Sequence, residues 1–331
     1  MSTAATTAEP TPNPTAAAEP RSSREVYRDI VAELLPGDER LICLDTDTGL
    51  FTGVDFGTGQ DRYLNLGIAE HTLMGAAAGL AREGRMPLVN TMAAFAASRA
   101  LEAVKLDIAL NDLPVRIAAT HSGVSAGHLG PTHHGLEDLA VMRTLPNMTV
   151  VVPADAAGTD TLFRQALTLP GPVYFRMGRN ATPDLPAGPP LELGRAQRLR
   201  HGTDITVAAC GPYPVLAALA AADELSAEGI STGVLHVHTV KPLDTAALAA
   251  AVRPGGTVIT VEEHWRTAGF GSAVAEALTE LVPVRVRRVA MPDAFVSVAG
   301  GQRYLVERGG ITARAIAAYA RSAVDPTRKD L

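Results

Sequence analysis

The chain has 331 residues, of which 47% are hydrophobic and 19% charged, and its formal net charge is −6. This composition is typical of a globular protein large enough for two domains, and it excludes a small peptide. The absence of excess positive charge argues against a nucleic-acid partner, and no uninterrupted apolar run is long enough to span a membrane.

The N-terminal segment and the cysteines indicate the compartment. Residues 1–22 are rich in Ala, Thr, Pro and Glu, so we expect a disordered tail, and they lack the basic and apolar segments of a secretory signal. Cys43 and Cys210 both lie in apolar runs typical of buried strands. We therefore predict no disulfide framework and a reducing compartment, the cytoplasm.

Strand and helix patterns alternate from Arg24 onward. Such alternation is typical of a parallel sheet with helices on both faces, and it predicts a first α/β domain over residues 23–183. Helices are predicted over 24–35, 71–84 and 95–110, and strands over 40–47, 62–68, 86–92, 113–121 and 148–155.

A proline-rich stretch without periodicity divides the chain. Pro183, Pro186, Pro189 and Pro190 lie in or beside the linker that we predict over residues 184–195. The second half, over 196–324, also reads as an open α/β domain, with a short tail over 325–331. The predicted fold class is thus two three-layer αβα domains. Strands in the second half are predicted over 204–211, 229–240, 256–264 and 284–292.

Glu70 lies where a predicted strand passes into an apolar helix of small residues. It could be an ordinary carboxylate favoured by the helix dipole. Its apolar neighbourhood leaves little water to solvate a charge, however. We therefore expect it either to be held protonated or to be hydrogen-bonded to a specific partner.

Histidines are concentrated in one part of the first domain. Three of them lie in "GHLGPTHHGLEDLA", residues 127–140. No cysteine joins them and no HExxH spacing occurs, so we predict no metal site. His121 ends a predicted strand, where open α/β sheets bind ligands, and the glycines after it allow close approach of the backbone. A mobile surface loop is the alternative.

Several motifs, in order and spacing, resemble the pyrimidine-binding and C-terminal domains of transketolase. They are "GIAEH", "NTMAAF", "ATHSGVSAGHLGPTHHGLEDLA", "LPNMTVVVPAD", "VKPLD", "VEEH" and "GFGSAVAEAL". The resemblance runs from about Arg24 to the C-terminal helical pattern. It implies a cofactor, thiamine diphosphate, bound across a subunit interface.

The resemblance implies roles for four residues near the cofactor. Glu70 would hydrogen-bond the ring nitrogen of the aminopyrimidine and favour the tautomer that removes the thiazolium C2 proton. Phe95 would stack on the pyrimidine, and Met92 would stand in a wall that is often aromatic in the family. Asp47 matches an acid near the cofactor. Simple core packing is the alternative for Phe95 and Met92.

Substrate contacts are implied in the same way. His121 and His133 match residues that line the substrate channel, and Arg24 and Arg179 match arginines that bind the phosphate of sugar phosphates. His128 and Leu129 replace a pair of acids, because members that use sugars have "GEDGPTH" where this chain has "GHLGPTH". Since leucine cannot accept a hydrogen bond from a hydroxyl of the donor, the preferred donor is left open.

Two motifs of transketolases are missing from the sequence. The family holds Mg²⁺ and the diphosphate through a GDG motif and a downstream pair of asparagines, and this chain has neither. We therefore predict one half of a split transketolase, in which Mg²⁺ and the diphosphate are held by a separate partner subunit. Two-fold self-association and a heterotetramer are expected.

Three other functions remain as alternatives. The chain could be a deoxyxylulose-phosphate-synthase-like enzyme or a β-type subunit of a 2-oxo acid dehydrogenase. It could also be a non-catalytic module that has kept only the fold. A dinucleotide site at "GFGSAVAE" has two glycines of a three-glycine pattern and is disfavoured.

Overall fold

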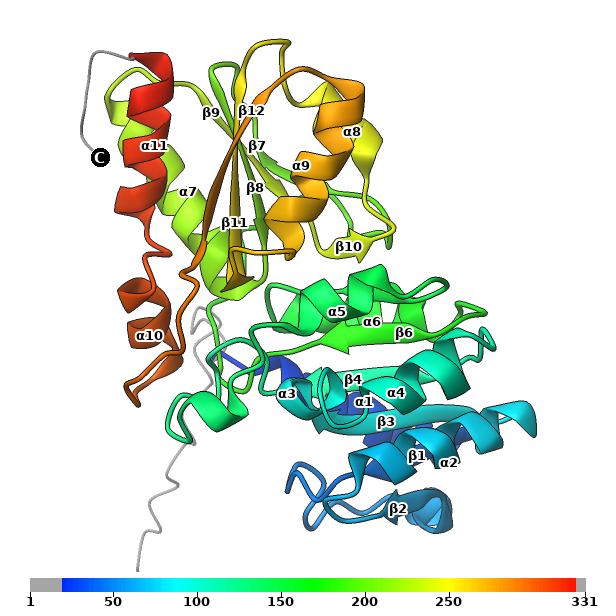
Figure 1. The fold of residues 1–331 in the computed structure, drawn as a ribbon. Coiled ribbons are helices and arrows are strands. Elements are labelled where there is room, and N and C mark those ends of the chain that lie inside the picture. Colours follow the sequence, from blue (N-terminus) through cyan, green and yellow to red (C-terminus); the bar gives the residue numbers. More distant parts are fainter. Residues whose placement is uncertain (1–19, 326–331) are drawn as a thin grey trace, which may run out of the picture.

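The computed structural model describes residues 20–325, which form two α/β domains stacked end to end (Figure 1). Residues 1–19 and 326–331, which make up most of the two predicted tails, lie outside this range. The last residue of the predicted N-terminal tail, Ser22, is buried and caps the first helix. The folded part of the first domain therefore begins earlier than the predicted boundary.

The first domain is built on a seven-stranded sheet in the order β10-β5-β6-β4-β3-β1-β2. All of its pairings except that of β10 are parallel, as the alternation of strands and helices predicts. The strands are β1 (Leu41–Asp45), β2 (Tyr63–Asn65), β3 (Met86–Met92), β4 (Arg116–Thr120), β5 (Thr149–Val151), β6 (Val173–Arg176) and β10 (Thr239–Lys241).

Helices cover both faces of this sheet. α1 starts at a capping box formed by Ser22 and Glu25 and packs against α6 on one face. α2 packs against the π-helix η2 on the other face. The helices are α1 (Ser23–Leu34), α2 (Glu70–Arg82), α3 (Ala93–Ala96), α4 (Leu101–Ala103), α5 (Asp138–Thr144) and α6 (Ala156–Ala166), with η1 (Gly57–Arg62), η2 (Val104–Ala109) and η3 (Pro131–His133).

The helix predicted over 95–110 is not continuous. It is divided into α3, α4 and η2, with a break over residues 97–100. At the break the Ser98 hydroxyl donates to the carbonyl oxygen of Ala94 at 2.5 Å, which competes with the backbone hydrogen bonds of a regular helix. The break separates the segment that carries Phe95 from the long helical segment behind it.

The second domain has a five-stranded sheet in the order β12-β11-β8-β9-β7, with only β7 antiparallel to its neighbour. α7 and α11 pack together on one face, and α8 and α9 cover the other. The elements are β7 (Gln197–Arg200), β8 (Ile205–Cys210), α7 (Pro212–Ala227), β9 (Thr232–His236), α8 (Thr245–Ala250), β11 (Thr257–Trp265), α9 (Phe270–Leu281), β12 (Arg285–Met291), α10 (Gln302–Arg308) and α11 (Ala313–Val324).

The strand predicted over 229–240 is in fact two strands in two different sheets. β9 lies in the second sheet, whereas β10 pairs antiparallel with β5 at the edge of the first sheet. The chain leaves one sheet for the other at Val237 and His238, both buried. The prediction of one strand was wrong because an uninterrupted apolar run carries no signal of where it changes sheet.

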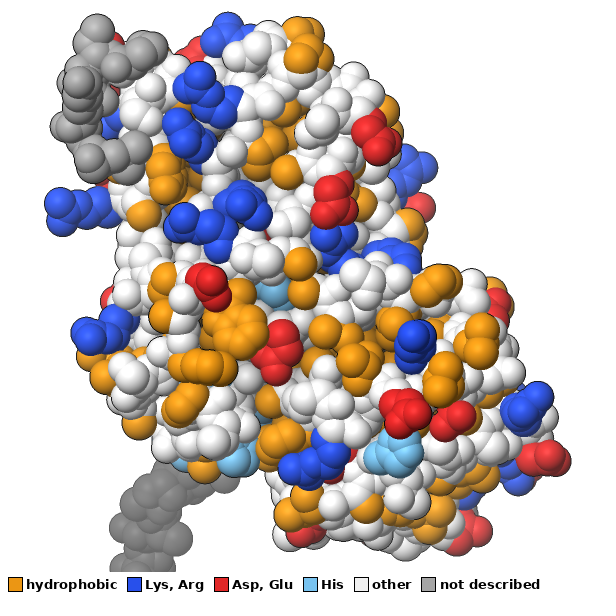
Figure 2. Space-filling model, viewed as in Figure 1, with side chains coloured by type: hydrophobic (Ala, Val, Ile, Leu, Met, Phe, Trp, Pro, Cys, Tyr) orange, Lys and Arg blue, Asp and Glu red, His pale blue; other side chains and the backbone are white. Residues whose placement is uncertain are grey.

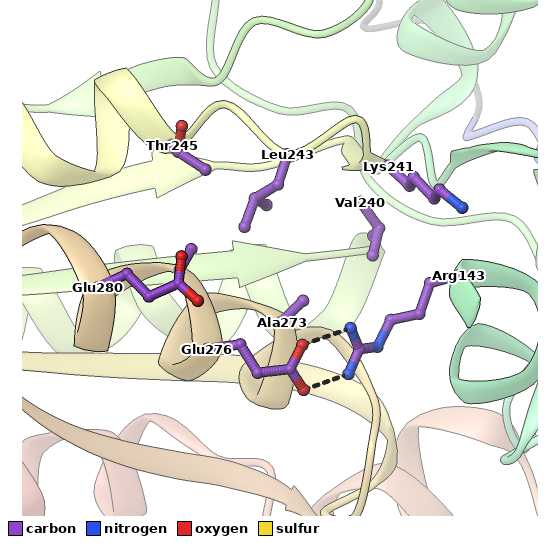
Figure 3. Close-up of a pocket in the computed structure, with 9 residues that line it drawn as sticks. Arg143, Val240, Lys241, Leu243, Thr245, Ala273, Glu276 and Glu280 are labelled. Carbon is purple, nitrogen blue, oxygen red and sulfur yellow. Dashed lines mark hydrogen bonds and ion pairs between the residues drawn. The ribbon is translucent and has the colours of Figure 1, made fainter. Parts of the chain in front are cut away.

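An ion pair and a crevice lie between α5 of the first domain and α9 of the second (Figure 3). Arg143 on α5 makes a bidentate ion pair with Glu276 on α9, at 2.7 and 2.9 Å, and Lys241 donates to the carbonyl oxygen of Leu145. The crevice has a volume of about 260 Å³ and also contains the Glu280 side chain. The two domains are thus held together by polar contacts as well as by β10.

Candidate active site

The predicted site residues come from loops and helix starts at one edge of the first sheet. Phe95 follows β3, His121 follows β4 and Arg179 follows β6, and these three strands are neighbours. Because the carboxyl ends of parallel strands meet at the same edge, the residues after them lie close together. Glu70 is the first residue of α2, and Arg24 lies in the first turn of α1.

Glu70 and Phe95 are joined by an arginine. The Glu70 side chain is 2% exposed, and its Oε2 accepts a hydrogen bond from Nη1 of Arg99 at 2.8 Å. The guanidinium carbon of Arg99 lies 4.6 Å from the centre of the Phe95 ring. The same ring forms a T-shaped contact with the His133 ring, with centroids 5.3 Å apart. These four residues form one continuous cluster, which we call the Glu70 cluster.

His121 is buried and lies among positive charges. Its backbone has a φ of 56°, which is uncommon for a residue other than glycine. Burial, together with the nearby positive charges of Arg24, Arg179, His128 and His133, lowers the pKa of His121 to about 3. The imidazole is therefore neutral at neutral pH. His121 thus lies near four other predicted site residues, namely Arg24, Arg179, His128 and His133.

Two arginines and a histidine line a place suited to an anion. Burial and the charge of Arg179 lower the pKa of Arg24, whose buried Nε has no hydrogen-bond partner among the described residues. Arg179 lies 2.7 Å from Nε2 of His128. The Leu129 side chain beside it is 42% exposed. In the described part of the chain no carboxylate forms an ion pair with either arginine, so an anionic group would find free donors here.

A carboxylate of the second domain holds the histidine-rich loop. Glu263 on β11 accepts from the backbone N–H of Val124 at 2.7 Å and from Nε2 of Gln302 at 2.9 Å. A side chain at Gly123, where φ is 60°, would place its Cβ 2.1 Å from the Glu263 carboxylate. Burial raises the pKa of Glu263 to about 7. The position of the loop thus depends on the docking of the two domains.

Two predicted site residues stand apart from these groups. Asp47 is exposed after β1 and accepts a hydrogen bond from Asn65 at 3.1 Å. Met92 is partly buried at the end of β3. Within residues 20–325, neither has a hydrogen bond or ion pair with Glu70 or Phe95. Their contacts with a cofactor stay predictions.

Arg99 and Glu263 were missed in the sequence analysis. Arg99 lies four residues after Phe95 within the helix predicted over 95–110, and side chains at this spacing meet on a helix, so the pair could have been proposed from sequence although the contact is made across a break. Glu263 is 139 residues from Val124, and no local pattern links the two.

Residues 20–325 contain no group of three or more His, Cys, Asp or Glu side chains that could hold a metal ion. Their helices include none with the length and apolar character needed to cross a membrane. The candidate site presents carboxylate, aromatic, imidazole and guanidinium groups.

Family models match both domains. The model of the transketolase pyrimidine-binding domain matches residues 19–184, and that of the transketolase C-terminal domain matches residues 194–316. The chain belongs to the transketolase family. The predicted resemblance and the predicted fold class of two αβα domains are therefore confirmed.

Two curated relatives of similar length are transketolase subunits. The 6-deoxy-6-sulfo-D-fructose transketolase subunit of Clostridium sp. (strain MSTE9) is 38% identical over 296 residues, or 88% of this chain and 91% of the relative. A subunit of the apulose-4-phosphate transketolase of Phocaeicola vulgatus is 40% identical over 277 residues, or 82% and 88%. The 1-deoxy-D-xylulose-5-phosphate synthase of Desulfotalea psychrophila is 34% identical, but the match covers only 47% of its length.

Solved structures agree with this assignment. A split gene transketolase, described as an inactive beta4 tetramer, has a TM-score of 0.81 and 39% identity, and the match covers 93% of this chain and 99% of that chain. The transketolase of Campylobacter jejuni has a TM-score of 0.76 at 20% identity and shares the fold over 47% of its chain. Close relatives of this chain are thus subunits of split transketolases.

Proposed function

We propose that this chain is one subunit of a thiamine-diphosphate-dependent split transketolase, which transfers a two-carbon ketol unit from a ketose or ketose phosphate to an aldehyde. The relatives named as transketolase subunits support this proposal, because the matches cover most of both chains. The observation that carries it is the arrangement of a buried carboxylate, Glu70, and an aromatic ring, Phe95, on either side of one planar N–H donor.

The residues of the Glu70 cluster fit the aminopyrimidine of the cofactor. The Arg99 guanidinium is itself flat and donates an N–H group, so the same place accepts a flat ring with an N–H group. Glu70 would hold the ring nitrogen, Phe95 would stack on the ring, Met92 would add apolar contact, and Asp47 would lie nearby. Thiamine diphosphate, when bound, supplies the electron sink that two-carbon transfer needs.

Substrate handling would fall to the histidines and arginines. A neutral imidazole can donate to one hydroxyl or accept from another, so His121 is suited to a polyol chain. His133 would contact the same chain. The free donors of Arg24 and Arg179 would bind a terminal phosphate or a similar anion. Leu129 offers no acceptor to a hydroxyl of the donor, so this position does not select for that hydroxyl.

A separate subunit would hold Mg²⁺ and the diphosphate. The apulose-4-phosphate transketolase relative, which is named as one subunit, and the split gene transketolase support a subunit role for this chain. Self-association would use the face near α2, where Ile68 is 73% and Leu110 is 71% exposed. Figure 2 shows hydrophobic side chains interspersed with charged ones over the first domain. We expect a heterotetramer in the cytoplasm.

A deoxyxylulose-phosphate-synthase-like reaction is the second candidate, supported by the 34% identity with such a synthase. The test is to combine this chain with its diphosphate-binding partner and to supply a ketose phosphate with an aldehyde, or pyruvate with an aldehyde. Two-carbon transfer without release of CO₂ is the expected result, with each subunit inactive alone. CO₂ release from pyruvate would favour the second candidate. A complex that binds thiamine diphosphate but turns over neither donor would indicate a non-catalytic module.

A further inference from the structure

Arg99 fills the space between the two residues expected to hold the aminopyrimidine. Its guanidinium donates to Glu70 Oε2 at 2.8 Å and lies 4.6 Å from the centre of the Phe95 ring. The Glu70 side chain is 2% exposed, so little besides this one donor reaches the carboxylate. Phe95 in turn packs against the His133 ring in a T-shaped contact.

A guanidinium and an aminopyrimidine offer the same contacts. Both are flat and delocalised, both stack on an aromatic face, and both present N–H groups in their plane. A carboxylate held at a fixed place beside the Phe95 ring binds either of them, but one at a time. The hydrogen bond and the stacking contact that Arg99 makes are those expected of the cofactor ring.

We propose that Arg99 occupies the aminopyrimidine site in the cofactor-free chain and that cofactor binding displaces it. This inference rests on the proposed function. Arg99 is therefore a placeholder for the cofactor: it pairs with the Glu70 carboxylate while the site is free and lowers the affinity for the cofactor. The cofactor ring takes over the same carboxylate oxygen when it binds.

The surroundings of Arg99 allow this displacement. Its side chain is 46% exposed, and Glu70 is its single hydrogen-bond partner within residues 20–325. Arg99 also lies in the break between α3 and α4, where the backbone is not part of a regular helix. The guanidinium can therefore move into water by giving up this hydrogen bond and its contact with the Phe95 ring, and no other hydrogen bond in the described part of the chain is lost. Once it has moved, Phe95 offers a free ring face.

The test uses the complex of this chain with its diphosphate-binding partner, and calorimetry measures the Kd of thiamine diphosphate with Mg²⁺ present. Arg99→Ala removes both contacts and is expected to lower the Kd on the order of tenfold. Arg99→Lys keeps the ion pair but loses the flat stacking group, so its Kd should fall between those of wild type and Arg99→Ala. Arg82→Ala is the matched control. Arg82 lies at the C-terminal end of α2, whereas Glu70 begins this helix, so the Kd should be unchanged.

An equal or higher Kd for both Arg99 variants would overturn the proposal, because Arg99 would then be neutral or would help to hold the cofactor. If Arg99→Ala does not assemble, Arg99→Lys decides by the same criterion. A structure of the complex with thiamine diphosphate gives a second readout: the 2.8 Å contact between Arg99 and Glu70 should be broken, and its persistence would contradict displacement. A wild-type complex that binds no thiamine diphosphate would instead refute the proposed function.

Discussion

Two carboxylate–arginine pairs in the first domain have nearly the same geometry and very different surroundings. Glu70 and Arg99 are 2.8 Å apart, and Asp138 and Arg176 are 2.7 Å apart. Arg99 is 46% exposed, whereas Arg176 is 4% exposed. The distance between the charges therefore does not distinguish the pairs, but the access of water and ligands does.

The Asp138–Arg176 pair is buried because both side chains make further contacts. Asp138 also accepts from the hydroxyl of Tyr174 at 2.8 Å. Arg176 donates to the carbonyl oxygens of Gly135 and Glu263, and so links the histidine-rich loop to β11 of the second domain. The Asp138–Arg176 pair thus lies buried between the domains and helps to hold them together. In the Glu70–Arg99 pair, the arginine is accessible to water and ligands. Substitutions in and around the two pairs test this difference.

Glu70→Gln should have the largest effect on activity. The amide has the same volume but cannot stabilise a protonated ring nitrogen, so turnover by the assembled complex should fall about a hundredfold or more. Circular dichroism and gel filtration should show an unchanged fold and assembly. Glu83→Gln, at the other end of α2, is the control and should keep full activity. Near-normal turnover by Glu70→Gln would sink the assignment of Glu70.

Asp138→Asn should mainly lower the stability of the protein, whereas Glu70→Gln mainly lowers its activity. Asp138→Asn leaves Arg176 buried without its charged partner, and breaking a buried pair in this way destabilises a protein by about 3–5 kcal/mol. Urea unfolding of the full chain measures the change. Asp160→Asn removes an exposed partner of Arg164 and should change stability by less than about 1 kcal/mol. Equal effects of the two variants would remove the contrast between sealed and open pairs.

Glu263 should make the stability of this sealed region depend on pH. Burial raises its pKa from 4.5 to about 7, so between these values the folded chain holds a proton that the unfolded chain has lost. Stability from this group is therefore lost as the pH rises from about 4.5 to about 7. Since glutamine does not titrate, Glu263→Gln should destabilise more at pH 5 than at pH 8, by up to about 3 kcal/mol. Urea unfolding at the two pH values checks this, and a cost independent of pH would contradict it.

Leu129→Asp should have the smallest effect, on substrate choice. A carboxylate at this exposed position in the open site can accept a hydrogen bond from a donor hydroxyl, which contributes about 1 kcal/mol. The kcat/KM for ordinary ketose phosphates should rise about fivefold relative to the wild type. Leu281→Asp, on the exposed surface of α9, is the control. No shift in donor preference would mean that another residue, such as His128, already makes the contact.

Local sequence patterns predicted the elements whose first and last residues are marked in the sequence. β3 extends over Met86–Met92, as predicted, because charged residues precede it and a helical pattern follows it. Two strands were absent from the prediction. β6, at Val173–Arg176, was not identified, and the charged residues of β7 hide its pattern. The change of sheet at Val237 depends on pairing with a strand far away in the sequence, which no local pattern encodes.

Some features of the candidate site were likewise indicated by the sequence, and others were found only in the structure. The resemblance indicated Glu70, Phe95 and His121, because each lies in a motif that is continuous in sequence. The partner of Glu70 depends on how α2 packs against the segment after β3, and the anchoring of the loop by Glu263 depends on domain docking. Such contacts are set by tertiary packing rather than by local sequence, so the structure was needed to find them.

We propose that this chain supplies the pyrimidine half of a cofactor site and that a partner supplies the rest. Calorimetric titration of the purified chain with thiamine diphosphate and Mg²⁺, alone and with the partner subunit, tests it most directly. One hydrogen bond and one stacking contact cannot outweigh the entropy lost on binding, so the chain alone should bind weakly or not at all, and the complex should bind tightly. Micromolar binding by the chain alone would contradict the claim, because the diphosphate site would then lie within these 331 residues.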